Sequence, residues 1–265
     1  MTLHFGFVLY HVRDLQAQPA VVLEALRILA DMGPGERVSI RGMLTGTDKF
    51  SRAVNLCTSA SERLSGIVSN GGYSEILAFL GNNPELAASL AMAIAPFGIG
   101  DSKVLDLTFT RLCAESHDVD RAEATSLQLW ALFGGLYGFS FVCSSDTELM
   151  QELSATPIQD WRSPASPNDA ERLLRLQRAK HYFGRFVRGP AWGTYLGPAL
   201  VAQLGGLSAV RETAPVSSVQ TLPDGGAYLR LTEEPVLRAS AQYATAARTL
   251  EVFLAPIMPA ELRTT

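Results

Sequence analysis

A run of strand, helix and strand at the start of the chain constrains its fold more than any other feature of the sequence. Residues 4–12 are aromatic and β-branched, a composition typical of a strand. After Pro19, apolar side chains recur at helical spacing until Gly33 and Pro34 end the pattern. Residues 37–44 then predict a second strand. The helix needs a partner for its apolar face, so we expect it to pack on the sheet that the strands build.

The same order returns in the middle of the chain. Residues 103–112 alternate between apolar and polar side chains, as a half-buried strand does. A helical pattern follows at residues 121–133, and closely spaced glycines lead from it into an apolar strand at residues 137–145. The two units are too different in sequence to indicate a duplication. Together they predict an α+β fold, in which strand-helix-strand units form a mixed or antiparallel sheet packed by helices.

The last part of the chain predicts a β-hairpin followed by a helix. Residues 216–232 hold two short strand patterns joined by PDGG, whose glycines supply the positive φ that a tight turn needs. Residues 239–257 then form an amphipathic helical pattern that Pro256 and Pro259 end. A C-terminal hairpin and helix therefore complete the expected fold.

A Pro- and Ser-rich stretch at residues 154–167 is the clearest loop in the sequence. A chain of 265 residues is long enough to bury a large core. We expect a single domain over residues 1–265, which could divide into lobes at about 1–150 and 168–265 joined by this loop.

The region between the two strand-helix-strand units is less clear. Residues 47–69 are polar and predict a stretch that is helical in part. Residues 73–81 fit a strand as well as a helix, because the apolar run is too short for periodicity to decide. Residues 84–98 predict a helix from their alanine-rich composition and from the prolines near both ends.

Bulk composition excludes several classes of protein. With 47% hydrophobic and 18% charged residues the chain is globular, and its net charge of −4 argues against a dedicated nucleic-acid binder. Cys57, Cys113 and Cys143 lie far apart without metal-ligand spacing, which favours buried, reduced thiols. The N-terminus lacks a signal-peptide pattern, and no apolar run is long enough to span a membrane. We therefore expect a cytoplasmic protein.

Motifs that carry chemistry are missing from the sequence. It contains no G-x-S-x-G elbow, no phosphate loop, no dinucleotide fingerprint and no metal-ligand spacing, so we expect neither a cofactor nor a metal. Cys113 and His117, in a loop after a strand, are the nearest approach to a nucleophile and its base. An unrecognised active site there remains an alternative, but the sequence favours binding over catalysis.

Basic side chains concentrate in one loop and helix, opposed there only by Asp169 and Glu171. They are Arg162, Arg172, Arg175, Arg178, Lys180, Arg185 and Arg188. The simpler interpretation is a solvated helix face whose arginine stems cover apolar surface. Nucleic-acid binding by residues 171–188 is the alternative, although aromatic side chains that would stack on bases are missing from the tract.

Acidic side chains gather after two of the predicted strands. The first group is Glu115, Asp118 and Asp120, and the second is Asp146, Glu148, Glu152 and Asp160, followed by Trp161. Successive strands can end at the same edge of a sheet, so the two groups could share an edge. Such an edge would attract a basic partner, because charge complementarity speeds encounter and disfavours wrong partners.

One segment resembles a known family. Within residues 187–212, a tryptophan, a Leu-Gly pair and a helix ending in Leu-Gly-Gly resemble the C-terminal signature of type VI secretion immunity proteins. The matching positions are Trp192, Leu196, Gly197, Leu204, Gly205 and Gly206. The similarity continues through the hairpin and extends more loosely to residues 127–142 and 8–14. We expect the glycines to form turns and Trp192 to pack in the core.

The resemblance implies an α+β protein of bacterial competition that binds the secreted toxin encoded beside it. Some relatives oppose nuclease toxins of restriction-endonuclease type. A nuclease holds phosphate, so its basic cleft would accept carboxylates from an acidic inhibitor. The expected partner is therefore a cognate nuclease toxin domain, and neither a membrane nor a nucleic acid.

Overall fold

The computed structural model describes most of the chain, namely residues 2–33, 38–44, 47–54, 58–70, 75–80, 88–94, 104–153 and 186–259. Its strands are β1 (Leu3–His11), β2 (Val38–Leu44), β3 (Thr47–Val54), β4 (Glu75–Leu80), β5 (Ala88–Ala93), β6 (Leu105–Cys113), β7 (Tyr137–Cys143), β8 (Gly193–Leu196), β9 (Ser218–Thr221) and β10 (Ala227–Arg230). Its helices are α1 (Pro19–Ala30), α2 (Thr58–Ser69), α3 (Ser116–Phe133), α4 (Asp146–Leu153), α6 (Pro198–Gln203), α7 (Leu207–Thr213) and α8 (Ala241–Leu254), which continues into the short 3₁₀ helix η2 (Ala255–Ile257).

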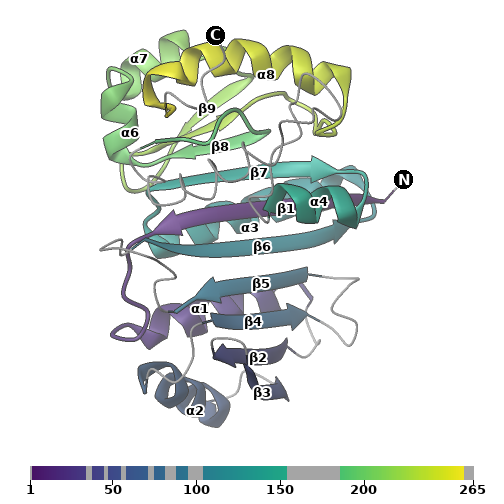
Figure 1. The fold of residues 1–265 in the computed structure, drawn as a ribbon, viewed down its shortest axis with the longest axis vertical. Helices are drawn as coiled ribbons and strands as arrows, with labels where there is room; N and C mark the ends of the chain where they lie inside the picture. The colour runs from purple at the N-terminus through teal and green to yellow at the C-terminus, as the bar shows by residue number, and fades with distance from the viewer. Residues whose placement is uncertain are drawn as a thin grey trace.

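All ten strands belong to one sheet, in the order β3-β2-β4-β5-β6-β1-β7-β8-β10-β9 (Figure 1). Every neighbouring pair is antiparallel, which settles the direction that the sequence left open. Because β7 pairs with β8, the sheet continues from one of the two predicted lobes into the other. The division of the chain into lobes stays a prediction.

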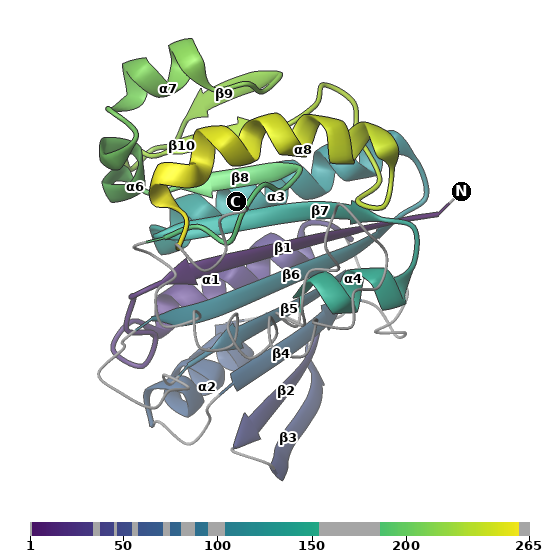
Figure 2. The ribbon, with the colours of Figure 1, turned by 45° about the horizontal axis from the view of Figure 1, so that its top comes forward.

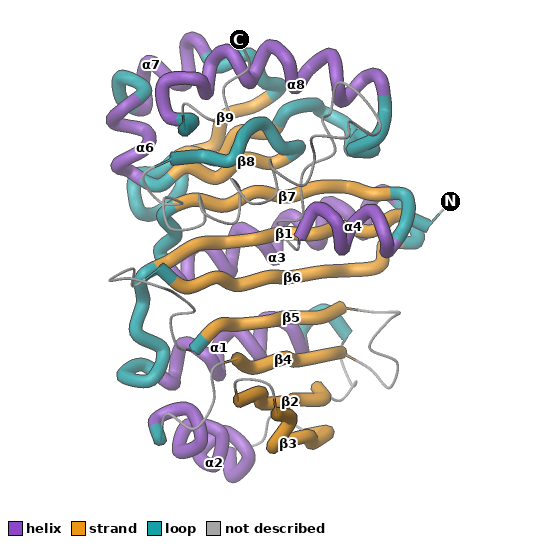
Figure 3. Tube along the Cα trace, in the orientation of Figure 1, coloured by secondary structure: helices purple, strands orange, loops and turns teal. Residues whose placement is uncertain are grey.

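The central strand β1 is buried on both faces from Phe5 to His11, since the unbroken apolar run of residues 5–10 cannot leave one face to solvent. On one face, called the back here, Phe5, Phe7 and Leu9 are buried; α3 covers β1 on this face, and α1 covers β2, β4 and β5 (Figures 1 and 2). On the other, the front, Tyr10 stacks on Tyr137 of β7, and α4 lies across β1 and β7. Figure 3 shows the same helices on either side of the orange sheet.

Most of the expected elements are confirmed. The first strand-helix-strand unit is β1, α1 and β2, and the second is β6, α3 and β7. The hairpin is β9 and β10, and the last helix is α8, which is followed directly by the 3₁₀ turn that contains Pro256. The α+β fold class is therefore correct. The predicted loop at residues 154–167 lies outside the described residues, and so does most of the basic tract.

The predicted helix at residues 84–98 is wrong. Its described part, Ala88–Ala93, is strand β5, in which Ala88, Leu90 and Met92 are buried and Ser89 and Ala91 are half-buried. Alanine favours a helix only as a weak local preference, which pairing with β4 and β6 overrides. The ambiguous stretch at residues 73–81 contains strand β4.

The described helices include no candidate for a membrane span, since none combines the necessary length with sufficient hydropathy.

Candidate functional site

The two predicted acidic groups leave the sheet at the same edge. Strands β6 and β7 both run antiparallel to β1, and they end at Cys113 and Cys143, which flank Leu3 and His4. The chain turns to the back after β6, into α3, and to the front after β7, into α4 (Figure 1). This acidic edge, defined by residues 114–120 and 144–148, therefore has carboxylates on both sides of the sheet.

Asp118 stabilises the first of these turns. Its carboxylate pairs with Arg111 at 2.9 Å and accepts hydrogen bonds from the backbone N–H groups of Ala114 and Glu115. Burial alone would raise the pKa of Asp118, but the backbone hydrogen bonds and Arg111 outweigh it, so the pKa lies below its usual value. The Asp118 side chain is thus committed to holding the start of α3.

The neighbouring carboxylates are more available. The Glu115 side chain is 73% exposed and lies 3.2 Å from a ring nitrogen of His117. Asp120 is 60% exposed and pairs with Arg230 of β10 at 3.1 Å. An exposed pair of this kind contributes little to stability, so a partner can compete for Asp120 at small cost.

The second acidic group also contains one exposed carboxylate and one that is hydrogen-bonded within the protein. Asp146 is exposed in the first turn of α4. Glu148 accepts hydrogen bonds from the backbone N–H and the hydroxyl of Ser144, at 2.8 and 2.9 Å, and so holds the turn. Asp160 and Trp161 lie outside the described residues.

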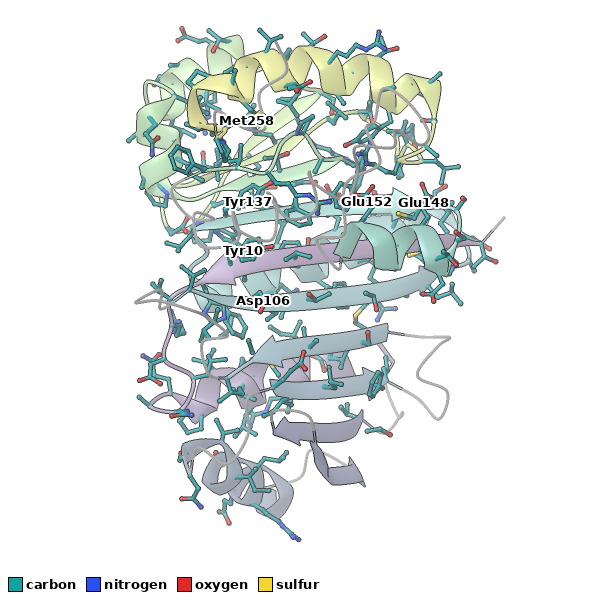
Figure 4. All side chains as sticks on the ribbon, in the orientation of Figure 1. Tyr10, Asp106, Tyr137, Glu148, Glu152 and Met258 are labelled. Carbon is teal, nitrogen blue, oxygen red and sulfur yellow. The ribbon has the colours of Figure 1, made fainter. Side chains whose placement is uncertain are left out.

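Glu152 is buried between two arginines. It accepts from Arg188 at 3.2 Å and lies 3.1 Å from Nε of Arg238, and all three side chains are less than a tenth exposed. Both guanidinium groups also lie near aromatic rings, Arg188 over Phe139 at 5.0 Å and Arg238 over Tyr243 at 4.6 Å. This buried cluster ties α4 to the C-terminal half of the chain. Figure 4 labels Glu152 and Glu148 on α4, in front of the strands that carry Tyr10 and Tyr137.

A third acidic turn at this edge was missed by the sequence analysis. Strand β10 runs parallel to β7, because both are antiparallel to β8, and the exposed Glu233 and Glu234 follow its end. The chain then returns to β7, where the backbone N–H of Arg238 donates to the carbonyl of Val142 at 2.9 Å. A Glu-Glu pair directly after a predicted strand was the available signal. The hairpin pattern predicted the turn before β10, but not the acidic turn after it.

Comparison with known protein families gives a match in the C-terminal half of the chain. The model of the TsiV family, described as type VI immunity for VRR-NUC, matches residues 131–263, half of the chain. This chain belongs to the TsiV family. A solved structure of a type VI secretion system protein from Pseudomonas aeruginosa shares its fold, with a TM-score of 0.63 and 12% identity. That match covers 97% of this chain and 73% of the other. No curated protein matches the sequence.

The aromatic and leucine positions of the C-terminal signature lie in or against the core. Trp192 is fully buried, its indole N–H donates to Thr232 at 3.2 Å, and the guanidinium of Arg230 lies over its ring at 5.1 Å. Leu196 is buried at the end of β8, and Leu204 packs against the core at the end of α6. These side chains stabilise the C-terminal half and are not available to a partner.

The glycines of the signature serve the backbone. A Cβ added at Gly197 would lie 2.7 Å from the carbonyl oxygen of Leu136 and 2.8 Å from that of Gly135, so only glycine permits this approach. Gly205 and Gly206 have φ of 91° and 92°, which other residues rarely adopt, and they separate α6 from α7.

The alternative active site at Cys113 and His117 finds no support in the geometry. Cys113 is buried at the end of β6, and burial raises the pKa of its thiol to about 12. A thiol that stays protonated at neutral pH is a poor nucleophile. His117 is 72% exposed and points to Glu115 and Asp118. Within the described part of the chain, no three His, Cys, Asp or Glu side chains could hold a metal ion.

The basic tract is described only at its end. Arg188 belongs to the buried cluster, where it is bound to Glu152. It is therefore not free to contact a nucleic acid. The six other basic residues of the tract lie outside the described residues.

Proposed function

We propose that this TsiV-family protein binds a cognate type VI secreted toxin with a nuclease domain and blocks its active site with the acidic edge. The family description, type VI immunity for VRR-NUC, supports a nuclease as the partner. A nuclease acts on nucleic acid in the cytoplasm, so the immunity protein would act there as well.

The observation that carries the proposal is the set of exposed carboxylates at one edge of the sheet. They are Glu115, Asp120, Asp146, Glu233 and Glu234. A nuclease cleft binds phosphates with basic side chains or cations, and carboxylates can occupy the same positions. The carboxylates of Asp118, Glu148 and Glu152 are bound within the protein. They would position the exposed carboxylates without contacting the toxin themselves.

The decisive experiment mixes the full-length protein with the toxin encoded beside its gene. We expect a one-to-one complex and loss of nuclease activity at equimolar protein. Raising NaCl from about 0.05 M to about 0.5 M should slow association at least about tenfold, because salt screens the attraction. Full nuclease activity in the presence of excess protein would refute the proposal.

A matched pair of variants tests the edge itself. Asp146→Lys reverses a charge in the acidic edge, and we expect slower association with the toxin at low salt. Glu212→Lys makes the same charge change on α7, an exposed position away from the edge, and should leave association unchanged (Figure 1). Equal effects of both variants would show that net charge alone steers the encounter.

A further inference from the structure

The two faces of strands β4, β5 and β6 differ sharply in burial. On the back, Ile76, Leu90 and Phe109 are at most 3% exposed beneath the helices. On the front, the alternate positions of the three strands are half-buried, except Ala93 at the end of β5, which is buried. Figures 1 and 3 show the described helices α1 and α3 behind the sheet, while α4 lies in front of β1 and β7.

Burial on the front falls off from β1 to β6. Val8 and Tyr10 of β1 are buried, at 1% and 6% exposure. Their cross-strand neighbours in β6, Thr108 and Asp106, are half-buried. Among the described elements, the cover on the front of the sheet therefore stops at β1.

Strand β6 contributes polar side chains to this open face, whereas β4 contributes two large apolar ones. The register aligns Leu77 with Ala91 and Thr108 across β4, β5 and β6. The next row aligns Phe79 with Ser89 and Thr110. A solvated face would carry polar side chains at the positions of Leu77 and Phe79. Both of these side chains are half-buried.

We propose that this open front face, defined by Glu75, Leu77, Phe79, Ala91 and Asp106, docks a basic toxin domain, and that Leu77, Phe79 and Ala91 form the apolar centre of the contact. The inference rests on the proposed function and extends the contact from the acidic edge onto the sheet. Stable protein interfaces combine a well-packed, largely apolar centre with a polar rim. The acidic edge by itself supplies only a charged rim, which speeds association more than it slows dissociation.

The acidic groups on the open front face also favour a basic partner. Its described ionisable groups in β4, β5 and β6 are the carboxyls of Glu75 and Asp106, because Arg111 points to the back, toward Asp118 of α3. Burial, and secondly the charge of Asp106, raises the pKa of Glu75. A cation from a partner would relieve this repulsion. Figure 4 shows Asp106 on β6, on the same side of the sheet as Glu148 and Glu152 of α4.

The test measures binding of full-length variants to the adjacent-gene toxin. Leu77→Lys removes apolar area and places a cation against a basic partner, so we expect the Kd to rise at least about tenfold, through faster dissociation. Leu77→Thr, a residue common on solvated strands, should raise the Kd less and leave thermal stability unchanged. The matched control is Val252→Lys on α8, where the wild-type side chain is 76% exposed, and its Kd should equal that of wild type.

Each outcome separates this inference from the function on which it rests. If the wild-type protein does not bind the toxin, the proposed function fails and the inference with it. If wild type binds and Leu77→Lys binds equally well, the inference alone is overturned. It is also overturned if Leu77→Thr melts several degrees lower than wild type, since the protein itself would then cover this face.

Discussion

Replacing Glu152 by glutamine tests the role of the buried cluster in holding α4. The wild-type carboxylate lies 3.2 Å from a terminal nitrogen of Arg188 and 3.1 Å from Nε of Arg238, and both arginines are at most 7% exposed. Glutamine keeps the shape and one acceptor oxygen but removes the negative charge. Two guanidinium charges would then remain buried without this carboxylate, beside aromatic rings and, for Arg188, the backbone carbonyl of residue 152.

The expected loss is large on the scale of protein stability. Removing one partner of a buried ion pair costs about 3–5 kcal/mol, because it leaves an uncompensated charge. Glutamine keeps one acceptor oxygen for the two arginines, so we expect the lower end of this range, about 3 kcal/mol. For a chain of this size that corresponds to a fall in melting temperature of roughly 6–12 °C.

Urea-induced unfolding of Glu152→Gln and wild type measures the difference in free energy directly. Glu234→Gln is the matched control, because it makes the same substitution at an exposed carboxylate, and its stability should stay within about 0.5 kcal/mol of wild type. A loss of less than about 1 kcal/mol for Glu152→Gln would refute the reasoning, since the two arginines would then not depend on this carboxylate.

Three further predictions follow from single residues. Gly197→Ala should destabilise the protein by about 2 kcal/mol or more in urea unfolding, because the new methyl group would overlap the Leu136 carbonyl; unchanged stability would contradict this close approach. Burial lowers the pKa of His11 to about 4, so the folded state binds fewer protons than the unfolded state between about pH 4 and 6.5, and stability should fall as pH falls through that window. His11→Phe should remove this part of the pH dependence, and parallel stability profiles for the two proteins would contradict it. Cys113 should resist iodoacetamide in the native protein and react after unfolding, as read by mass spectrometry of its peptide, since its thiol is buried with a pKa of about 12.

Several elements of the fold were predictable because the signal is local. Alternation identified β6, helical spacing identified α1, and PDGG identified the turn between β9 and β10. The failure at residues 88–93 has the opposite cause, because alanine and leucine fit both a helix and a buried strand. Only pairing with β4 on one side and β6 on the other decides for the strand.

The acidic composition of the candidate site was predictable from the sequence. Which of its carboxylates are exposed and which are bound within the protein was not. Sequence shows that acidic residues follow two strands, and the register places both strand ends beside the start of β1. It does not show that Glu152 faces Arg188, 36 residues further along the chain, while Asp146 faces solvent. Nor does it show that Glu233, more than a hundred residues after Asp120, follows a strand that ends at the same edge.

The sequence by itself determined the fold class, the order of most elements and the family signature, because these depend on spacing along the chain. The tertiary structure decided which carboxylates are committed and which are exposed, and it left the front of β4, β5 and β6 without a described cover. Those properties depend on which side chains meet across the sheet. A one-residue change of register would exchange its buried and open faces without changing the composition.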